Sequence, residues 1–135
     1  MFRYLSLLTL MLSASSFAAI AVYTDRHHPP INVSPDTRVV YLDAAEQQQQ
    51  NMFGTLAKDP ARAERQARSV IHAAGWPQQQ AALVQAYQGL IQAWQLGLKK
   101  YPAVVFDDRD VVYGTADIAL AQSYRRGRTQ AEGQP

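Results

Sequence analysis

The chain has 135 residues, of which 47% are hydrophobic, and this length and composition favour one globular domain over a disordered chain. The formal net charge is only +2, so the composition gives no electrostatic argument for nucleic-acid binding, which needs a concentrated basic face. The chain contains no cysteine, which excludes thiol redox chemistry and cysteine-ligated metal sites.

Residues 1–18 have the order of a secretory signal peptide. Arg3 precedes an apolar run over residues 5–12, and small residues follow the run. Ser16 and Ala18 fit the −3 and −1 positions of a cleavage site, so we expect cleavage after Ala18.

Two alternatives to this cleavage remain open. Cleavage after Ala21 is possible, but it would remove part of the first predicted strand. The segment could also stay as a membrane anchor, but its apolar run is shorter than the roughly 20 residues that span a bilayer. We therefore expect an exported protein with one domain over residues 19–126 and a flexible C-terminal tail over residues 127–135.

Two strands are predicted first, over residues 19–24 and 38–42, because both segments are short and rich in strand-forming residues. Between them, residues 25–36 contain several prolines and show no helical period, so we predict a loop. A connection of this length is just enough for the two strands to run parallel.

Helix-start signals follow the second strand. Asp43 is predicted to cap a helix from Ala44, with Glu46 at the matching position of a capping box, and Gly54 is a plausible end. Asp59 followed by Pro60 predicts the start of the next helix.

That second helix is expected to end at Gly75, with its inward positions at Ala63, Ala67, Val70, Ile71 and Ala74. The longest helix is predicted from Trp76 to about Leu98. One apolar stripe along this helix is expected to be the main core-facing surface, and its members are Leu83, Tyr87, Leu90, Ile91, Trp94 and Leu98.

Pro102 ends the longest helix, and a hairpin is predicted next, with strands over residues 103–106 and 111–113. Thr115 is expected to cap a last helix over residues 116–125. The element order is thus β-β-α-α-α-β-β-α, which predicts an α/β fold with a small mixed four-stranded sheet and helices packed on it.

Three histidines raise the question of a metal site, and they are His27, His28 and His72. Adjacent residues on an extended chain point to opposite sides, so His27 and His28 would rarely bind one ion together. A metal site needs three or four converging ligands, so the simpler interpretation is that these are loop and helix histidines, and no metal or other cofactor is expected.

The other polar clusters have simpler structural explanations. The acidic residues Asp107, Asp108 and Asp110 lie in a turn too short for a calcium loop of the EF-hand type, and aspartates favour such turns through local hydrogen bonds. No serine has the Gly-x-Ser-x-Gly context of a hydrolase, and no glycine-rich phosphate loop is present. The basic residues near the end of the last helix are expected to form a solvated face.

An ordered set of short motifs along nearly all of the mature chain resembles a family of small exported proteins encoded in bacterial integrating conjugative elements. The set comprises Val22-Tyr23-Thr24-Asp25, His28-Pro29, Val39-Val40-Tyr41-Leu42-Asp43, Ala86-Tyr87-Gln88-Gly89, Ala93-Trp94, Leu96-Gly97, Pro102-Ala103-Val104-Val105-Phe106-Asp107, Val111-Val112-Tyr113-Gly114 and Asp117.

This family is also similar to the thioredoxin-like pilus-assembly proteins of F-type conjugation systems. The resemblance implies a cysteine-free thioredoxin-like fold in which the bond between Tyr101 and Pro102 is cis, and a periplasmic part of a conjugative type IV secretion apparatus. A working thioredoxin would carry Cys-x-x-Cys after the first strand, where this chain has Arg26-His27-His28-Pro29-Pro30. An interaction role is therefore expected rather than an enzymatic one.

By the same analogy, two loops are expected to form the surface that binds a partner protein. The residues are Asp25, His27, His28, Pro29, Tyr101, Pro102 and Ala103. The expected partners are other proteins of the transfer apparatus, with no nucleic acid and no stable membrane insertion. Two alternatives remain: a free-standing periplasmic chaperone-like binder unrelated to conjugation, and a hydrolase or metalloprotein that uses His27 or His28.

Overall fold

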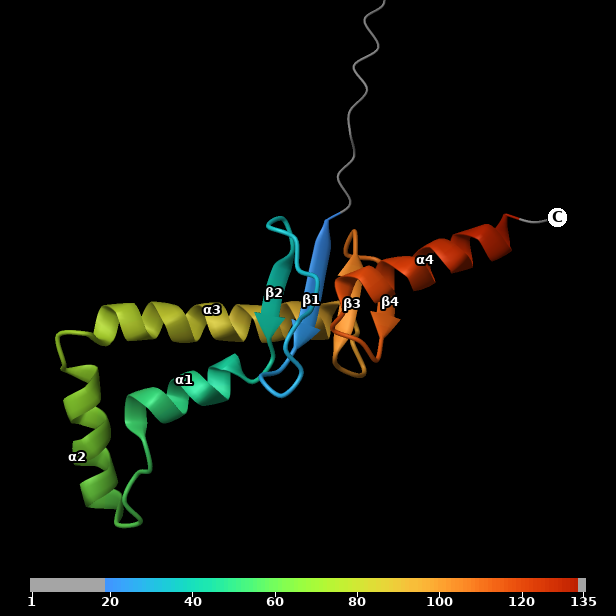
Figure 1. Ribbon diagram of the computed structural model, residues 1–135. Coiled ribbons are helices and arrows are strands. Elements are labelled where there is room, and N and C mark those ends of the chain that lie inside the picture. The colour runs from blue at the N-terminus through green and yellow to red at the C-terminus, as the bar shows by residue number, and fades with distance from the viewer. Residues whose placement is uncertain (1–18, 134–135) are drawn as a thin grey trace, which may run out of the picture.

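The computed structural model describes residues 19–133, so the predicted signal peptide lies outside the described residues (Figure 1). The eight elements occur in the predicted order. Their bounds are β1 (Ile20–Thr24), β2 (Arg38–Tyr41), α1 (Ala44–Phe53), α2 (Pro60–Ile71), α3 (Trp76–Gln95), β3 (Ala103–Phe106), β4 (Asp110–Tyr113) and α4 (Ile118–Glu132).

The four strands form one mixed sheet in the order β2-β1-β3-β4. β1 pairs in parallel with β2, which confirms the predicted crossover, whereas the β1–β3 and β3–β4 pairs are antiparallel. β1 and β3 lie at the centre, and all four residues of β3 are buried. Central strands covered on both faces need apolar side chains on both sides, which explains why β3 is the continuous run Ala-Val-Val-Phe.

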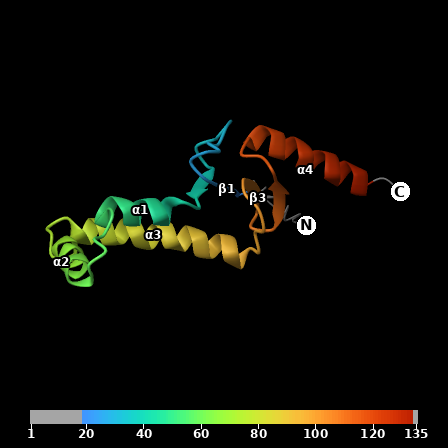
Figure 2. The same ribbon diagram turned by 90° about the horizontal axis from the view of Figure 1, so that it is seen from below.

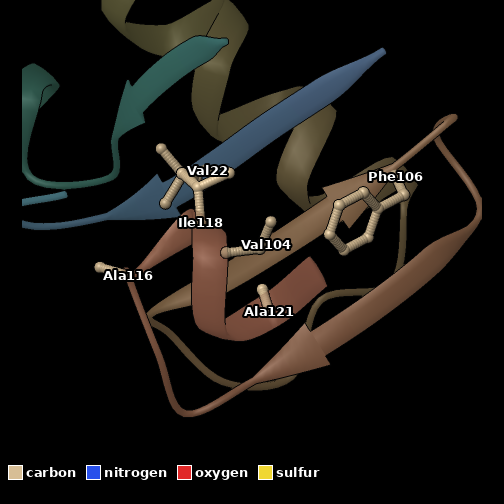
Figure 3. Close-up of a cluster of buried hydrophobic side chains, with 6 residues drawn as sticks. All are labelled: Val22, Val104, Phe106, Ala116, Ile118 and Ala121. Atoms are coloured by element: carbon tan, nitrogen blue, oxygen red, sulfur yellow. The ribbon is translucent and has the colours of Figure 1, made fainter. Parts of the chain in front are cut away.

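A hydrophobic cluster lies on each face of the sheet, because successive side chains of a strand point to opposite faces. On one face, Val22, Val104 and Phe106 pack against Ile118 and Ala121 of α4 (Figure 3). On the other face, Tyr23 and Val105 pack against Ala93 of α3. Figure 2 shows α3 and α4 on opposite sides of the sheet. The mixed α/β architecture is therefore as predicted.

Helix α3 approaches the sheet closely at Gly89. A Cβ atom placed on Gly89 would lie 2.7 Å from Cγ1 of Val40 on β2. Only a residue without a side chain allows the helix backbone to come this near the strand.

The long loop between β1 and β2 is attached to the start of α4. The Ile31 amide donates to the carbonyl of Ala116, and the Ile118 amide donates to the carbonyl of Ile31, both at 3.0 Å. The Asn32 side chain also donates to Oδ1 of Asp117 at 2.8 Å. A loop that begins beside α1 therefore crosses to the face covered by α4.

Residues 44–95, which comprise α1, α2 and α3, extend beyond the sheet and are here called the helical arm (Figure 1). Helix α2 has no buried residue, and Ala93 is the one fully buried residue of α3. Helix α2 ends at Ile71, several residues before the predicted end at Gly75, and Ile71 itself is exposed.

The prediction that the apolar stripe of α3 is the main core-facing surface is wrong. Four of its residues are exposed, namely Tyr87, Leu90, Ile91 and Trp94. The reason is the rotation of the helix about its axis. Gly89 meets β2 and Ala93 packs on the sheet, so these two residues, one turn apart, mark the face of α3 that meets the sheet. At about 100° per residue the exposed stripe lies on the other side of the helix and points away from the sheet.

Of the three side chains predicted to cap helices, one is confirmed and two are wrong. Asp59 accepts a hydrogen bond from the Arg62 amide at 3.1 Å, as predicted. The capping box at Asp43 is wrong, because its side chain caps no amide of α1 and its Oδ2 instead accepts from the Arg26 amide at 3.3 Å. The predicted cap at Thr115 is also wrong. Asp117 caps α4 instead, because its Oδ1 accepts from the amides of Ala119 and Leu120. The Thr115 hydroxyl accepts from the Asp117 amide.

Helix α4 also continues to Glu132, beyond its predicted end at residue 125. Among residues 19–133, no helix combines the length and the apolar character that crossing a bilayer requires.

Candidate functional site

A groove of about 1100 Å³ lies between α1, the C-terminal part of α3 and the loop that follows β1, and we call it the α1–α3 groove. Its volume exceeds the roughly 300–1,000 Å³ of typical small-ligand pockets. The apolar lining residues are Leu42, Leu90, Ile91, Ala93, Trp94 and Leu98. The polar ones are Asp25, His27, Asp43, Glu46, Gln47, Gln50, Lys99, Lys100 and Tyr101.

Trp94 is the most unusual residue of the groove, because 81% of its surface is exposed. Leu90 and Ile91, which are 40% and 50% exposed, lie one turn earlier on α3. Residues at spacings of three and four share one helix face, so these three side chains form a continuous apolar ridge. Grouped exposed apolar side chains mark binding surfaces, and tryptophan is favoured at protein interfaces.

Helix α1 packs beside this ridge without covering it. It buries Ala45 and Met52, and Gln49 Nε2 donates to the Tyr87 hydroxyl on α3 at 2.7 Å. Gln47 and Gln50 of the same helix line the polar wall of the groove, and the α3 ridge lines its apolar wall.

The loop after β1 is held at the groove by Asp25, which is only 9% exposed. Its Oδ1 accepts from the amides of His27 and His28, both at 3.0 Å, and lies 2.7 Å from Nδ1 of His28. The Thr24 hydroxyl donates to the His28 carbonyl. The His28 side chain, helped by the two amides, lowers the pKa of the Asp25 carboxyl although burial opposes this. Asp25 is thus a carboxylate that fixes the turn.

Carboxylates gather on the α1 side of the groove, where the bond from the Arg26 amide to Asp43 holds the loop beside the start of α1. Oδ1 of Asp43 is buried and has no hydrogen-bond partner among residues 19–133. Glu46 lies in the first turn of α1. Lys99 and Lys100 follow α3 on the other lip. The groove is therefore acidic along α1 and basic beyond the end of α3.

The predicted contact residues divide into two groups. Asp25 and His27 of the first loop and Tyr101 of the second line the same groove, so the structure brings the two predicted loops together. His28 and Pro29 are exposed beside it, whereas Pro102 is half-buried and Ala103 is fully buried as the first residue of β3. The bond between Tyr101 and Pro102 is cis, as predicted.

Sequence reasoning did not identify the apolar part of the groove. Leu90, Ile91 and Trp94 were expected in the core, as part of the α3 stripe. A signal was present: the small residues Gly89 and Ala93 share another face of α3, and small residues let a helix pack closely on a sheet.

The other polar clusters play structural parts. Asp107 and Asp108 adopt φ values of 55° and 52°, so they form the turn between β3 and β4. Arg125 of α4 donates to Asp107 at 3.1 Å and to Asp110 at 3.3 Å, and its guanidinium lies 4.8 Å from the Phe106 ring centre. Within residues 19–133, no three or more His, Cys, Asp or Glu side chains are arranged to hold a metal ion.

Comparison with known proteins places the chain in a family. A family model described as "Protein of unknown function (DUF1525)" matches residues 17–130, so the chain belongs to the DUF1525 family. No curated protein and no solved structure gives a significant match.

Proposed function

We propose that this member of the DUF1525 family is a non-enzymatic periplasmic component of a conjugative type IV secretion apparatus, and that it acts by binding another protein in the α1–α3 groove. The observation that carries the binding role is the apolar ridge of Leu90, Ile91 and Trp94. Leaving such a ridge in water is unfavourable, since each buried square ångström of apolar surface is worth about 25 cal/mol. A protein surface that covered Trp94 would recover this free energy.

The conjugative context is supported by the ordered motifs that resemble proteins of integrating conjugative elements. Five groove residues belong to those motifs, namely Asp25, Leu42, Asp43, Ala93 and Trp94. The export signal predicted over residues 1–18 supports the periplasm as the place of action.

We further propose that the domain is a cysteine-free relative of thioredoxin-like proteins. The mixed four-stranded sheet, the helices on its two faces and the cis peptide bond before β3 support this relationship. Tyr101, on one side of this bond, lines the groove. The proposed partner site therefore adjoins the loop that is expected to contact a partner by analogy with thioredoxin-like proteins.

The test is a donor strain in which the gene is deleted and replaced by defined variants. We expect deletion to lower the transfer frequency of the element and the wild-type gene to restore it, whereas Trp94→Ala restores it poorly at equal protein level. A photo-crosslinking residue at position 94 should capture a protein of the transfer apparatus.

The matched control places the same crosslinker at Val84, which is 50% exposed on the same helix but does not line the groove. Unchanged transfer after deletion would refute the conjugative role and favour a general chaperone-like binder. Equal capture from positions 84 and 94 would refute the groove as the contact site.

A further inference from the structure

We propose that the α1–α3 groove binds an amphipathic helical segment of its partner, about three turns long, with basic side chains toward α1 and acidic side chains toward Lys99 and Lys100. This inference rests on the proposed function, because it assigns the chemistry of the partner at that same groove.

The groove favours a helix over an extended strand. The free edges of the sheet are β2 and β4, and no residue of either strand lines the groove. An added strand would therefore find no row of unpaired backbone groups to bond with. A helix satisfies its own backbone hydrogen bonds and needs only apolar side chains that fit between the two walls.

The dimensions set the length of the bound helix. The residues that line the α1 wall run from Asp43 to Gln50, which at 1.5 Å per residue is about 12 Å. Leu90, Ile91 and Trp94 occupy one turn of the opposite wall. A partner helix of about three turns would contact both walls along their full length, with apolar residues at spacings of three and four against the ridge.

The charges give the partner its second feature. Asp43 and Glu46 place two carboxylates on the α1 side of the groove. Carboxylates that line a groove favour lysine or arginine side chains on its occupant, because such pairs form charge-assisted hydrogen bonds. The two lysines on the other lip favour acidic side chains on the opposite flank of the helix.

The experiment uses the mature chain with Trp76→Phe, which leaves Trp94 as the single tryptophan. Three helical peptides of 11 residues, or about three turns, share one leucine face and differ in their flanks. The mixed peptide carries lysine on one flank and glutamate on the other. The second peptide carries lysine on both flanks, and the third carries glutamate on both. We expect the mixed peptide to bind at least 10-fold more tightly than the other two and to shift Trp94 emission to shorter wavelength.

Two pairs of variants locate the binding. Ile91→Ser should weaken the mixed peptide at least 10-fold, whereas Val84→Ser, at the same 50% exposure on the same helix, should not change its affinity. Glu46→Lys should turn the preference toward the peptide with glutamate on both flanks. Asp36→Lys makes the same change at an exposed position outside the groove and should leave the preference unaltered.

Equal affinity for the three peptides, or equal losses from Ile91→Ser and Val84→Ser, would overturn the inference. Failure of the inference is distinguishable from failure of the proposed function. A transfer protein crosslinked at position 94 without binding of any helical peptide would refute only the helical partner. Selective peptide binding with normal conjugation after deletion would refute only the conjugative role.

Discussion

Large apolar side chains are buried between the sheet and α4, whereas those of the helical arm are largely exposed. Phe106 of β3 is 1% exposed, whereas Trp94 of α3 is 81% exposed. Every residue of β3 is buried, while α2 contains no buried residue at all. The comparison indicates that the sheet supplies most of the stability of the domain and that the arm leaves much of its apolar surface exposed.

The largest expected effect comes from a matched pair of aromatic truncations. Phe106→Ala should lower the free energy of unfolding by about 3–5 kcal/mol, because it leaves a cavity between the sheet and α4. Trp94→Ala should change it by less than about 1 kcal/mol, because a side chain that exposed loses little packing. Urea denaturation followed by circular dichroism measures both. A large loss for Trp94→Ala would show that the ridge is part of the core after all.

An intermediate effect is expected where the arm meets the sheet, at Gly89. Gly89→Ala would place a methyl group 2.7 Å from Val40 Cγ1, and overpacking of this kind costs about 1–3 kcal/mol. Alanine regains about 1 kcal/mol through its helix propensity, so we expect a net loss of about 1 kcal/mol in the free energy of unfolding, again measured in urea.

Two comparisons check the cause. In a Val40→Ala background the cost of Gly89→Ala should disappear, because the clashing methyl group is gone. Gly127→Ala in α4, where a Cβ would meet no atom within 4 Å, should stabilise the protein by up to about 1 kcal/mol. A stabilising effect at Gly89 would mean that α3 and β2 are farther apart than described.

The smallest effect concerns Asp25, which joins the sheet to the groove. Because the folded-state pKa of Asp25 is lowered, its ionised form stabilises the native state above the unfolded-state pKa, and this contribution is lost as pH falls through the folded-state pKa. Asp25→Asn should therefore be less stable than the wild type at neutral pH, with the difference shrinking in acid.

The measurement is the free energy of unfolding of both proteins between neutral and acidic pH, with the Asp25 carboxyl titrated by NMR. His28→Ala should raise the pKa of Asp25, because the largest cause of its lowering is the His28 side chain. A stability difference that stays constant over this pH range would contradict the assignment.

Features with a local cause could be predicted from the sequence. The strand runs around Val22 and Val104 have a continuous apolar pattern, and Asp59-Pro60 and Gly54 mark helix ends through their own side chains or backbone freedom. Asp43 was misassigned because it bonds to the distant Arg26 amide, a partner that depends on tertiary structure.

The groove depends on such tertiary information in a similar way. The periodicity of α3 shows that Leu90, Ile91 and Trp94 share a face, but the same pattern is expected for a core helix and for a binding helix. The deciding fact is which face of α3 meets the sheet, and this is the face that carries Gly89 and Ala93. The first loop was predicted as a contact surface from analogy, and Asp25 and His27 do line the groove.

The two hydrogen bonds between Ile31 and the chain around α4 tie opposite faces of the sheet together. The segment that starts at Asp25 in the groove reaches this attachment six residues later, so only a short stretch of chain connects the groove to the start of α4. If an incoming protein pulled Asp25 outward, the strain would fall on the amides of Ile31 and Ile118, whose exchange with deuterated solvent would then speed up far from the point of contact.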